Sequence, residues 1–129
     1  AGRQWYELQE STAKTLNAID KQNLKGLPLL LFDAYRHMLK LLALLNQRPY
    51  TTYPRFIAEA ERFKLQPPSF KTLTGIIVNG KYQDLSRLKK IITRVFDEFE
   101  AMLEQSGIDP YYDEVDPNIP MKRGLRRRS

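Results

Sequence analysis

The only histidine of the 129-residue chain is the residue best suited to acid–base catalysis. His37 follows Asp33 by four residues, and on a helix this spacing places the two side chains on one face. A carboxylate that orients an imidazole is typical of a general base, so the pair would suit a hydrolase or transferase site. The alternative is a surface or half-buried histidine with a helical neighbour. The sequence favours this alternative, because it places no serine or cysteine nucleophile near the ring.

Other patterns of catalysis and metal binding are missing from the sequence. The absence of cysteine excludes thiol catalysis and thiolate metal sites, and it favours a reducing compartment such as the cytoplasm. The acidic residues lack the Glu-x-x-His motif of di-metal bundles, so we expect them to be solvated helix faces. They are Glu7, Glu10, Asp97, Glu98, Glu100 and Glu104. No phosphate-binding glycine motif is present. We therefore expect no catalytic residue, no metal and no cofactor.

Basic residues gather in two places. Residues 1–116 hold 16 bases against 15 acids, so the net charge of +6 comes mainly from the C-terminal tail. The tail bases are Lys122, Arg123, Arg126, Arg127 and Arg128. A second group surrounds the start of the last predicted helix: Lys81, Arg87, Lys89, Lys90 and Arg94. Both groups could bind RNA, DNA or another anion through counter-ion release. The alternatives are a solubilising tail and, for the helix, counter-charges from neighbouring helices or a second subunit.

Apolar residues recur at helical spacing along most of the chain. They predict three long and two short helices, at about residues 3–20, 28–46, 54–63, 70–79 and 84–106. Ser69 and Asp84 are candidate N-caps, and Gly80 is a candidate terminator. The broad apolar stripe of the second helix makes it the central one. Residues 76–78 would also suit a strand, but no partner strand is apparent.

This pattern predicts an all-α, four-helix-type bundle. We expect the bundle to occupy residues 1–107, and we expect residues 108–129 to form an irregular tail that is first acidic and then basic. No apolar segment reaches the length of about 20 residues that spans a bilayer. The sequence therefore predicts a soluble protein without a membrane partner.

Residues 73–82, with the sequence LTGIIVNGKY ahead of the last predicted helix, resemble the corresponding part of HEPN domains. These are small helical bundles found with minimal nucleotidyltransferases and in toxin–antitoxin systems. Their ribonuclease motif is an arginine followed a few residues later by a histidine, just before the final helix. Thr74 and Asn79 stand at the matching positions here. The resemblance thus implies a member without ribonuclease activity, which binds a partner and helps a nucleotidyltransferase hold its substrate.

The sequence leaves two functions open. The first is a non-catalytic helical interaction module that binds a protein partner or a second copy of itself. The aromatic stretch from Tyr50 to Tyr53, with Phe56 and Phe63, could serve as its interface, although core packing is the commoner role of such residues. The second is a nucleic-acid-binding protein that uses the basic tail and the basic half of the last helix.

Overall fold

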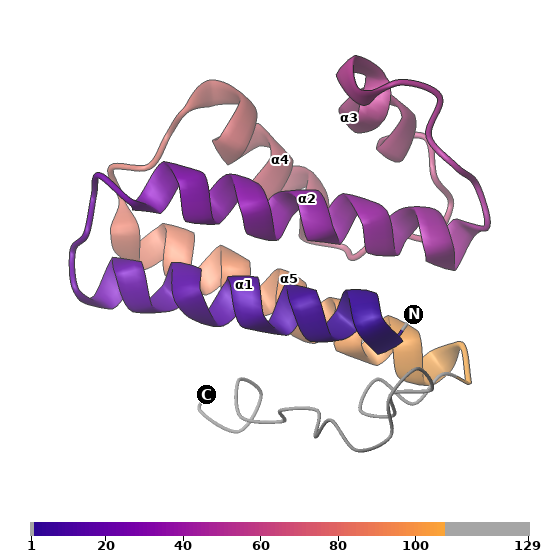
Figure 1. Cartoon of the computed structure of the whole chain (residues 1–129), viewed down its shortest axis with the longest axis horizontal. Helices are drawn as coiled ribbons and strands as arrows, with labels where there is room; N and C mark the ends of the chain where they lie inside the picture. The colour runs from indigo at the N-terminus through magenta and orange to yellow at the C-terminus, as the bar shows by residue number, and fades with distance from the viewer. Residues whose placement is uncertain (1, 108–129) are drawn as a thin grey trace.

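The computed structural model describes residues 2–107, which fold into five α-helices and one short 3-10 turn (Figure 1). The elements are α1 (Gly2–Asp20), α2 (Leu27–Asn46), η1 (Tyr53–Arg55), α3 (Phe56–Ala60), α4 (Phe70–Asn79) and α5 (Leu85–Gln105). No strand occurs in this part of the chain, and residues 76–78 are helical. The predicted all-α fold with three long and two short helices is therefore confirmed. The predicted tail lies outside the described residues.

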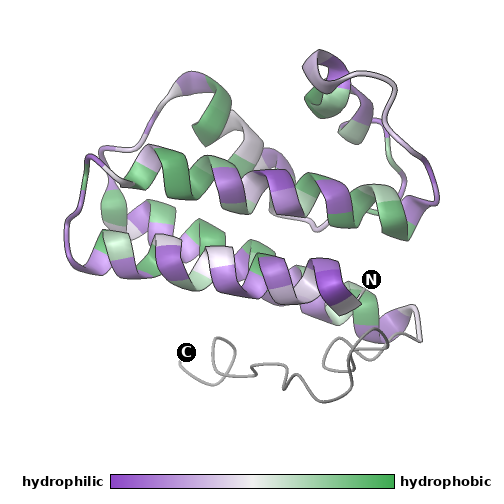
Figure 2. Cartoon of the chain, viewed as in Figure 1, coloured by the Kyte–Doolittle hydropathy of each residue, from purple (hydrophilic) through white to green (hydrophobic). Residues whose placement is uncertain are grey.

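The three long helices run side by side, and the short helices lie on one side of them (Figure 1). α1 and α2 form an antiparallel hairpin, and α5 runs back along α1. α3 packs against α2, and α4 packs against α5 and reaches α2 through the stack of Phe70 on Tyr35. Each long helix is amphipathic, with polar and apolar faces that alternate around its axis (Figure 2).

Aromatic side chains join the helices across the core. Trp5 of α1 stacks on Phe96 of α5 with ring centroids 4.6 Å apart. Tyr35 of α2 stacks on Phe70 of α4 at 5.3 Å, and Phe70 meets Phe99 of α5 edge to face at 6.1 Å. All five side chains are buried. These contacts fix α4 and α5 against the α1–α2 hairpin.

The helix ends follow mainly local signals. The Asp84 carboxylate accepts a hydrogen bond from the Arg87 backbone N–H at 3.1 Å, which confirms the predicted N-cap of α5. Gly80 ends α4 in the left-handed conformation, with φ of 64°. Gln47 ends α2 in the same conformation, with φ of 52°. None of the helices in residues 2–107 has the length and apolarity needed to cross a membrane.

The helix predicted at 54–63 is shorter than expected. The chain forms η1, then α3, and turns out of the helix after Ala60. The Gln66 side-chain amide donates hydrogen bonds to the carbonyls of Ala60, Glu61 and Phe63. Gln66 therefore satisfies carbonyls that a longer helix would have used internally.

Candidate functional site

His37 lies between α1 and α2 and faces a carboxylate from each helix. Its Nδ1 is 3.4 Å from Oε2 of Glu7 in α1, and its Nε2 is 3.8 Å from Oδ1 of Asp33 in α2. Asp33 also accepts hydrogen bonds from the Ser11 hydroxyl at 3.0 Å and the Arg36 guanidinium at 2.8 Å. The five side chains form a polar cluster that connects the two helices.

This geometry does not suit nucleophilic catalysis. The Ser11 hydroxyl donates to Asp33 and not to the imidazole, and the 3.8 Å between His37 and Asp33 exceeds hydrogen-bond length. Burial lowers the pKa of His37, and Asp33 and Glu7 oppose this effect only in part. The histidine is therefore neutral at neutral pH. We interpret it as a histidine packed between helices, and it is more buried than the surface or half-buried histidine that the sequence favoured.

The sequence missed the role of Glu7. It was expected on a solvated face, but its carboxylate is half-buried against His37. Asp33 is the second carboxylate beside His37. The hydrogen bond that Arg36 donates to it is the main cause of its lowered pKa, so Asp33 stays ionised. Within residues 2–107 no group of three or more acidic or histidine side chains is placed to hold a metal ion.

The basic half of α5 lies along a groove between α1 and α5, which we call the α1–α5 groove. It has a volume of about 940 Å³ and a partly apolar floor that includes Leu16. Three of the predicted anion-binding residues line it: Lys89, Lys90 and Arg94. Asp20, Asp97 and Glu98 line it too, and Lys89 pairs with Asp20 at 2.6 Å. Positive and negative side chains are thus interspersed in this groove.

The other predicted basic residues lie elsewhere. Lys81 is exposed in the loop before α5, and Arg87 is exposed in the first turn of α5 without lining the groove. The tail residues lie outside the described part of the chain: Lys122, Arg123, Arg126, Arg127 and Arg128. Of the five predicted cationic residues in the described part of the chain, three therefore line one groove, and anion binding by the whole set stays a prediction.

Two carboxylates of α5 depart from the expected solvated face. Glu100 is only 2% exposed, because its side chain turns toward the core. Glu98 accepts two hydrogen bonds from Ser69, one from the backbone N–H at 2.8 Å and one from the hydroxyl at 2.9 Å. Ser69 does occupy the N-cap position of α4, but its hydroxyl donates to Glu98 and does not cap the helix.

A second groove lies where α2 ends and the chain turns toward η1. We call this region, formed by the C-terminal part of α2 and residues 47–56, the aromatic corner. Its groove has a volume of about 660 Å³, and Leu44, Tyr50 and Phe56 provide much of the wall. Lys40 and Arg48 also line it, and none of the described residues that line it is acidic.

Residues 5–109 match the KNTase C-terminal domain family, a match that runs from α1 through the whole of α5. The chain belongs to this family. It is therefore a helical domain associated with nucleotidyltransferases. No curated protein and no solved structure matches the chain.

In this KNTase C-terminal domain, the residues at the two positions of the HEPN motif form hydrogen bonds with other parts of the fold. Thr74 is buried, and its hydroxyl forms a hydrogen bond of 2.8 Å with the Tyr35 hydroxyl. The Asn79 side-chain amide donates to the Gly75 carbonyl at 2.8 Å, within α4 itself. Thr74 packs in the core, and Asn79 is exposed at the end of a helix.

The stretch of the KNTase C-terminal domain that contains the aromatic corner is basic. Residues 40–66 contain five bases and two acids, whereas residues 1–116 as a whole are almost neutral. This local excess of bases is a sequence signal that the near-neutral total conceals.

Proposed function

We propose that this domain is a non-catalytic helical module that binds a nucleotidyltransferase and helps it hold its substrate. Membership of the KNTase C-terminal domain family carries the proposal. The HEPN resemblance of residues 73–82 agrees with it, since both families associate with nucleotidyltransferases. The absence of cysteine favours the cytoplasm as the place of this association.

The first turns of α2 offer an apolar surface for the nucleotidyltransferase. Leu29 is 76% exposed and Phe32 is 48% exposed, and their spacing of three residues places them on one face of the helix. Leu24, in the preceding turn, is 59% exposed. Large apolar side chains grouped on a surface are typical of protein interfaces, where aromatic anchors contribute much of the affinity.

Isothermal titration calorimetry with a minimal nucleotidyltransferase from the same genome tests this proposal. We expect the wild-type chain to form a complex, and we expect the double variant Leu29→Glu/Phe32→Glu to weaken it at least tenfold, about the effect of losing one anchor. Leu65→Glu is the matched control, because Leu65 is also 48% exposed but lies near the other end of α2, where its backbone N–H donates to the Asn46 side chain.

Three results separate the possible outcomes. Wild-type affinity in Leu65→Glu, together with a loss in the double variant, supports the proposed surface. Equal affinities of the wild type and both variants would show that the interface does not include this surface of α2. A wild-type chain that forms no complex would contradict the proposed association itself. Circular dichroism of each variant checks that the helices are retained.

A further inference from the structure

The aromatic corner presents three rings in a row. Phe56 stacks on Tyr50 with centroids 4.2 Å apart and on Tyr53 at 4.9 Å, so it lies between the two tyrosines. The Tyr50 hydroxyl donates to the Leu39 carbonyl of α2 at 2.6 Å, which fixes the inner end of the row. Tyr53, the outer ring, is 69% exposed. The row is therefore a rigid platform whose outermost ring is open to solvent.

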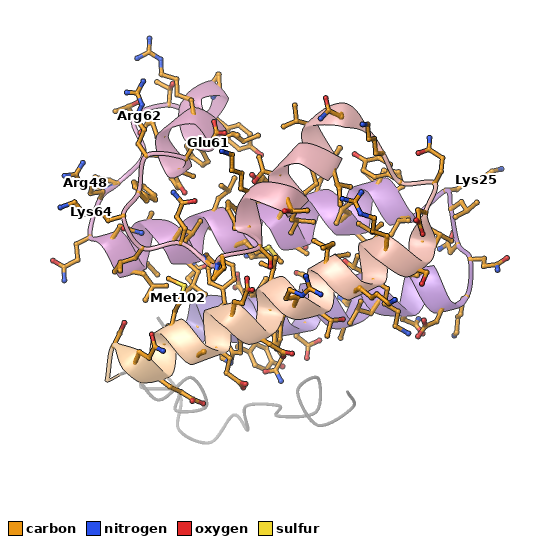
Figure 3. All side chains as sticks on the ribbon, turned by 180° about the vertical axis from the view of Figure 1, so that it is seen from behind. Lys25, Arg48, Glu61, Arg62, Lys64 and Met102 are labelled. Atoms are coloured by element: carbon orange, nitrogen blue, oxygen red, sulfur yellow. The ribbon has the colours of Figure 1, made fainter. Side chains whose placement is uncertain are left out.

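Basic residues accompany this platform in the groove and along the chain. Lys40 and Arg48 line the groove beside Tyr50 and Phe56, and Arg55 follows Tyr53 by two residues. Further basic side chains, Arg62 and Lys64, lie at the same end of the molecule as Arg48 (Figure 3). Lys25 lies at the opposite end (Figure 3). The corner thus combines exposed aromatic surface with a local excess of positive charge.

The two nearby acids reduce this excess without cancelling it. The Glu59 carboxylate accepts hydrogen bonds from the Thr51 hydroxyl and backbone N–H, at 2.5 and 3.3 Å, which binds it to the loop. Glu61 is exposed and lies close to Arg62 at the corner (Figure 3). Residues 40–66 contain five bases and only these two acids, so the net charge of this stretch is +3.

We propose that the aromatic corner binds single-stranded nucleic acid. An unpaired base would stack on the open ring of Tyr53, and the adjoining phosphates would contact Lys40 and Arg48. Cationic grooves beside stacking rings are how proteins hold single strands without reading their sequence. Duplex bases are already stacked on one another and are therefore not expected to bind here.

The shape of the groove favours a strand over a free nucleotide. Small-molecule sites enclose most of their ligand, but this groove is open along the surface, and Tyr53, which stacks on Phe56 of its lining, is mostly exposed. The cations also come from several elements, with Lys40 in α2, Arg48 in the following turn, and Arg62 and Lys64 after α3. An acidic peptide would satisfy the cations but would leave the stacking platform unused.

Fluorescence anisotropy with the full-length chain tests this proposal. The probe is a labelled oligouridine of about ten nucleotides, within the site size of single-strand binders. We expect Tyr53→Ala to weaken binding about tenfold, because stacking contributes much of the affinity per base. Tyr53→Phe keeps the ring and should retain wild-type affinity. Both changes lie at an exposed position, and thermal unfolding followed by circular dichroism verifies the fold.

A second pair of variants tests the phosphate contacts. Lys40→Ala/Arg48→Ala should weaken binding and reduce the slope of log affinity against log salt by about 1.4, the value for two contacts on a single strand. Lys21→Ala/Lys25→Ala removes the same charge from the turn between α1 and α2, at the end of the molecule opposite α3 (Figure 1), and should leave the salt slope unchanged.

Binding to an abasic strand, competition by other anions and the pattern across the variants identify the ligand and the site. Stronger binding of oligouridine than of an abasic strand of equal length supports base stacking. Equal affinity for the two strands would overturn it, as would displacement by uridine monophosphate or oligoglutamate at the concentration at which unlabelled strand competes. Wild-type affinity in both Tyr53→Ala and the Lys40/Arg48 double variant would place any binding elsewhere in the chain. No binding by wild type would also overturn the proposal.

Discussion

The α1–α5 groove and the aromatic corner are both lined by cations, but they differ in what lies beside those cations. In the α1–α5 groove, Lys89 and its two basic neighbours face Asp20 and two further carboxylates. At the aromatic corner, Lys40 and Arg48 share the groove with aromatic rings and with no acidic residue among those described. The first arrangement compensates its own charge, and the second leaves its charge available to an anion.

The comparison shows that a cluster of basic residues in a sequence is a poor guide to an anion site. The bases of α5 are close together in the sequence, yet helix packing brings Asp20 of α1 against Lys89. The bases of residues 40–66 are scattered along the sequence, yet the turn after α2 brings Arg48 into one groove with Lys40, beside Tyr50 and Phe56. The placement of the carboxylates therefore decides the local potential.

The largest effect is expected from breaking the packing that forms the α1–α5 groove. Phe96→Ala removes the ring that stacks on Trp5 and should reduce the free energy of unfolding by about 3–5 kcal/mol. Urea denaturation measures this loss. Phe32→Ala is the control, because the 48% exposed ring should cost less than about 0.5 kcal/mol. Similar losses in the two variants would contradict the described core.

A smaller loss is expected when the groove loses Glu98. Glu98→Ala leaves the Ser69 backbone N–H and hydroxyl without their acceptor, which should cost about 1–3 kcal/mol in urea denaturation. Glu98→Gln keeps an acceptor oxygen and removes the charge, so it should retain more of the stability. If the two variants were equally unstable, the charge and not the hydrogen bonds would account for the loss.

A pH-dependent change is expected where the α1–α2 hairpin holds His37. Burial lowers the pKa of the folded histidine below its unfolded value near 6.5, so the unfolded state takes up the proton first as the pH falls. The contribution of His37 to the free energy of unfolding is therefore fully present above about pH 6.5, and it declines as the pH falls through the folded pKa. Urea midpoints between pH 7.5 and 5.5 measure the decline.

The control for this pH dependence is His37→Gln, which removes the only histidine of the chain. The variant should show a flatter dependence of stability on pH across the same interval. An NMR titration of the single imidazole gives the folded pKa directly. A value above 6.5 would show that Glu7 and Asp33 outweigh burial, contrary to our expectation.

The smallest effect is expected from the exposed pair of the α1–α5 groove. Asp20→Asn removes the partner of Lys89 and should change the free energy of unfolding by less than about 1 kcal/mol, because the pair is solvent-exposed. The same variant sharpens the comparison, since it makes the groove more basic. Oligouridine affinity should rise slightly in Asp20→Asn if the groove can bind anions, and an unchanged affinity would argue that it cannot.

Much of the fold could be predicted from the sequence, because its signals are local. The apolar repeat gave the five helices, and Asp84 and Gly80 marked two of their ends where the structure has them. The short helix at residues 54–63 was predicted too long, because its end depends on hydrogen bonds from the Gln66 side chain. Such a contact depends on how the following loop folds back.

The candidate sites could be predicted only in part, because their neighbours come from different helices. Glu7 reaches His37 only through the rotation of α1 against α2, which no spacing in the sequence specifies. The burial of Glu100 depends likewise on which face of α5 turns inward. The rings of the aromatic corner were visible in the sequence, but their exposure was not, since Phe63 is buried while Tyr53 is open.

The contact between Ser69 and Glu98 has a consequence for how the domain is made on the ribosome. Ser69 is synthesised 29 residues before the carboxylate that accepts its two hydrogen bonds. α4 has only ten residues and is too short to be stable by itself. During translation, α4 is therefore stabilised only after the second half of α5 has left the exit tunnel. A nascent chain stopped before residue 98 would lack the carboxylate that accepts both hydrogen bonds at the start of α4.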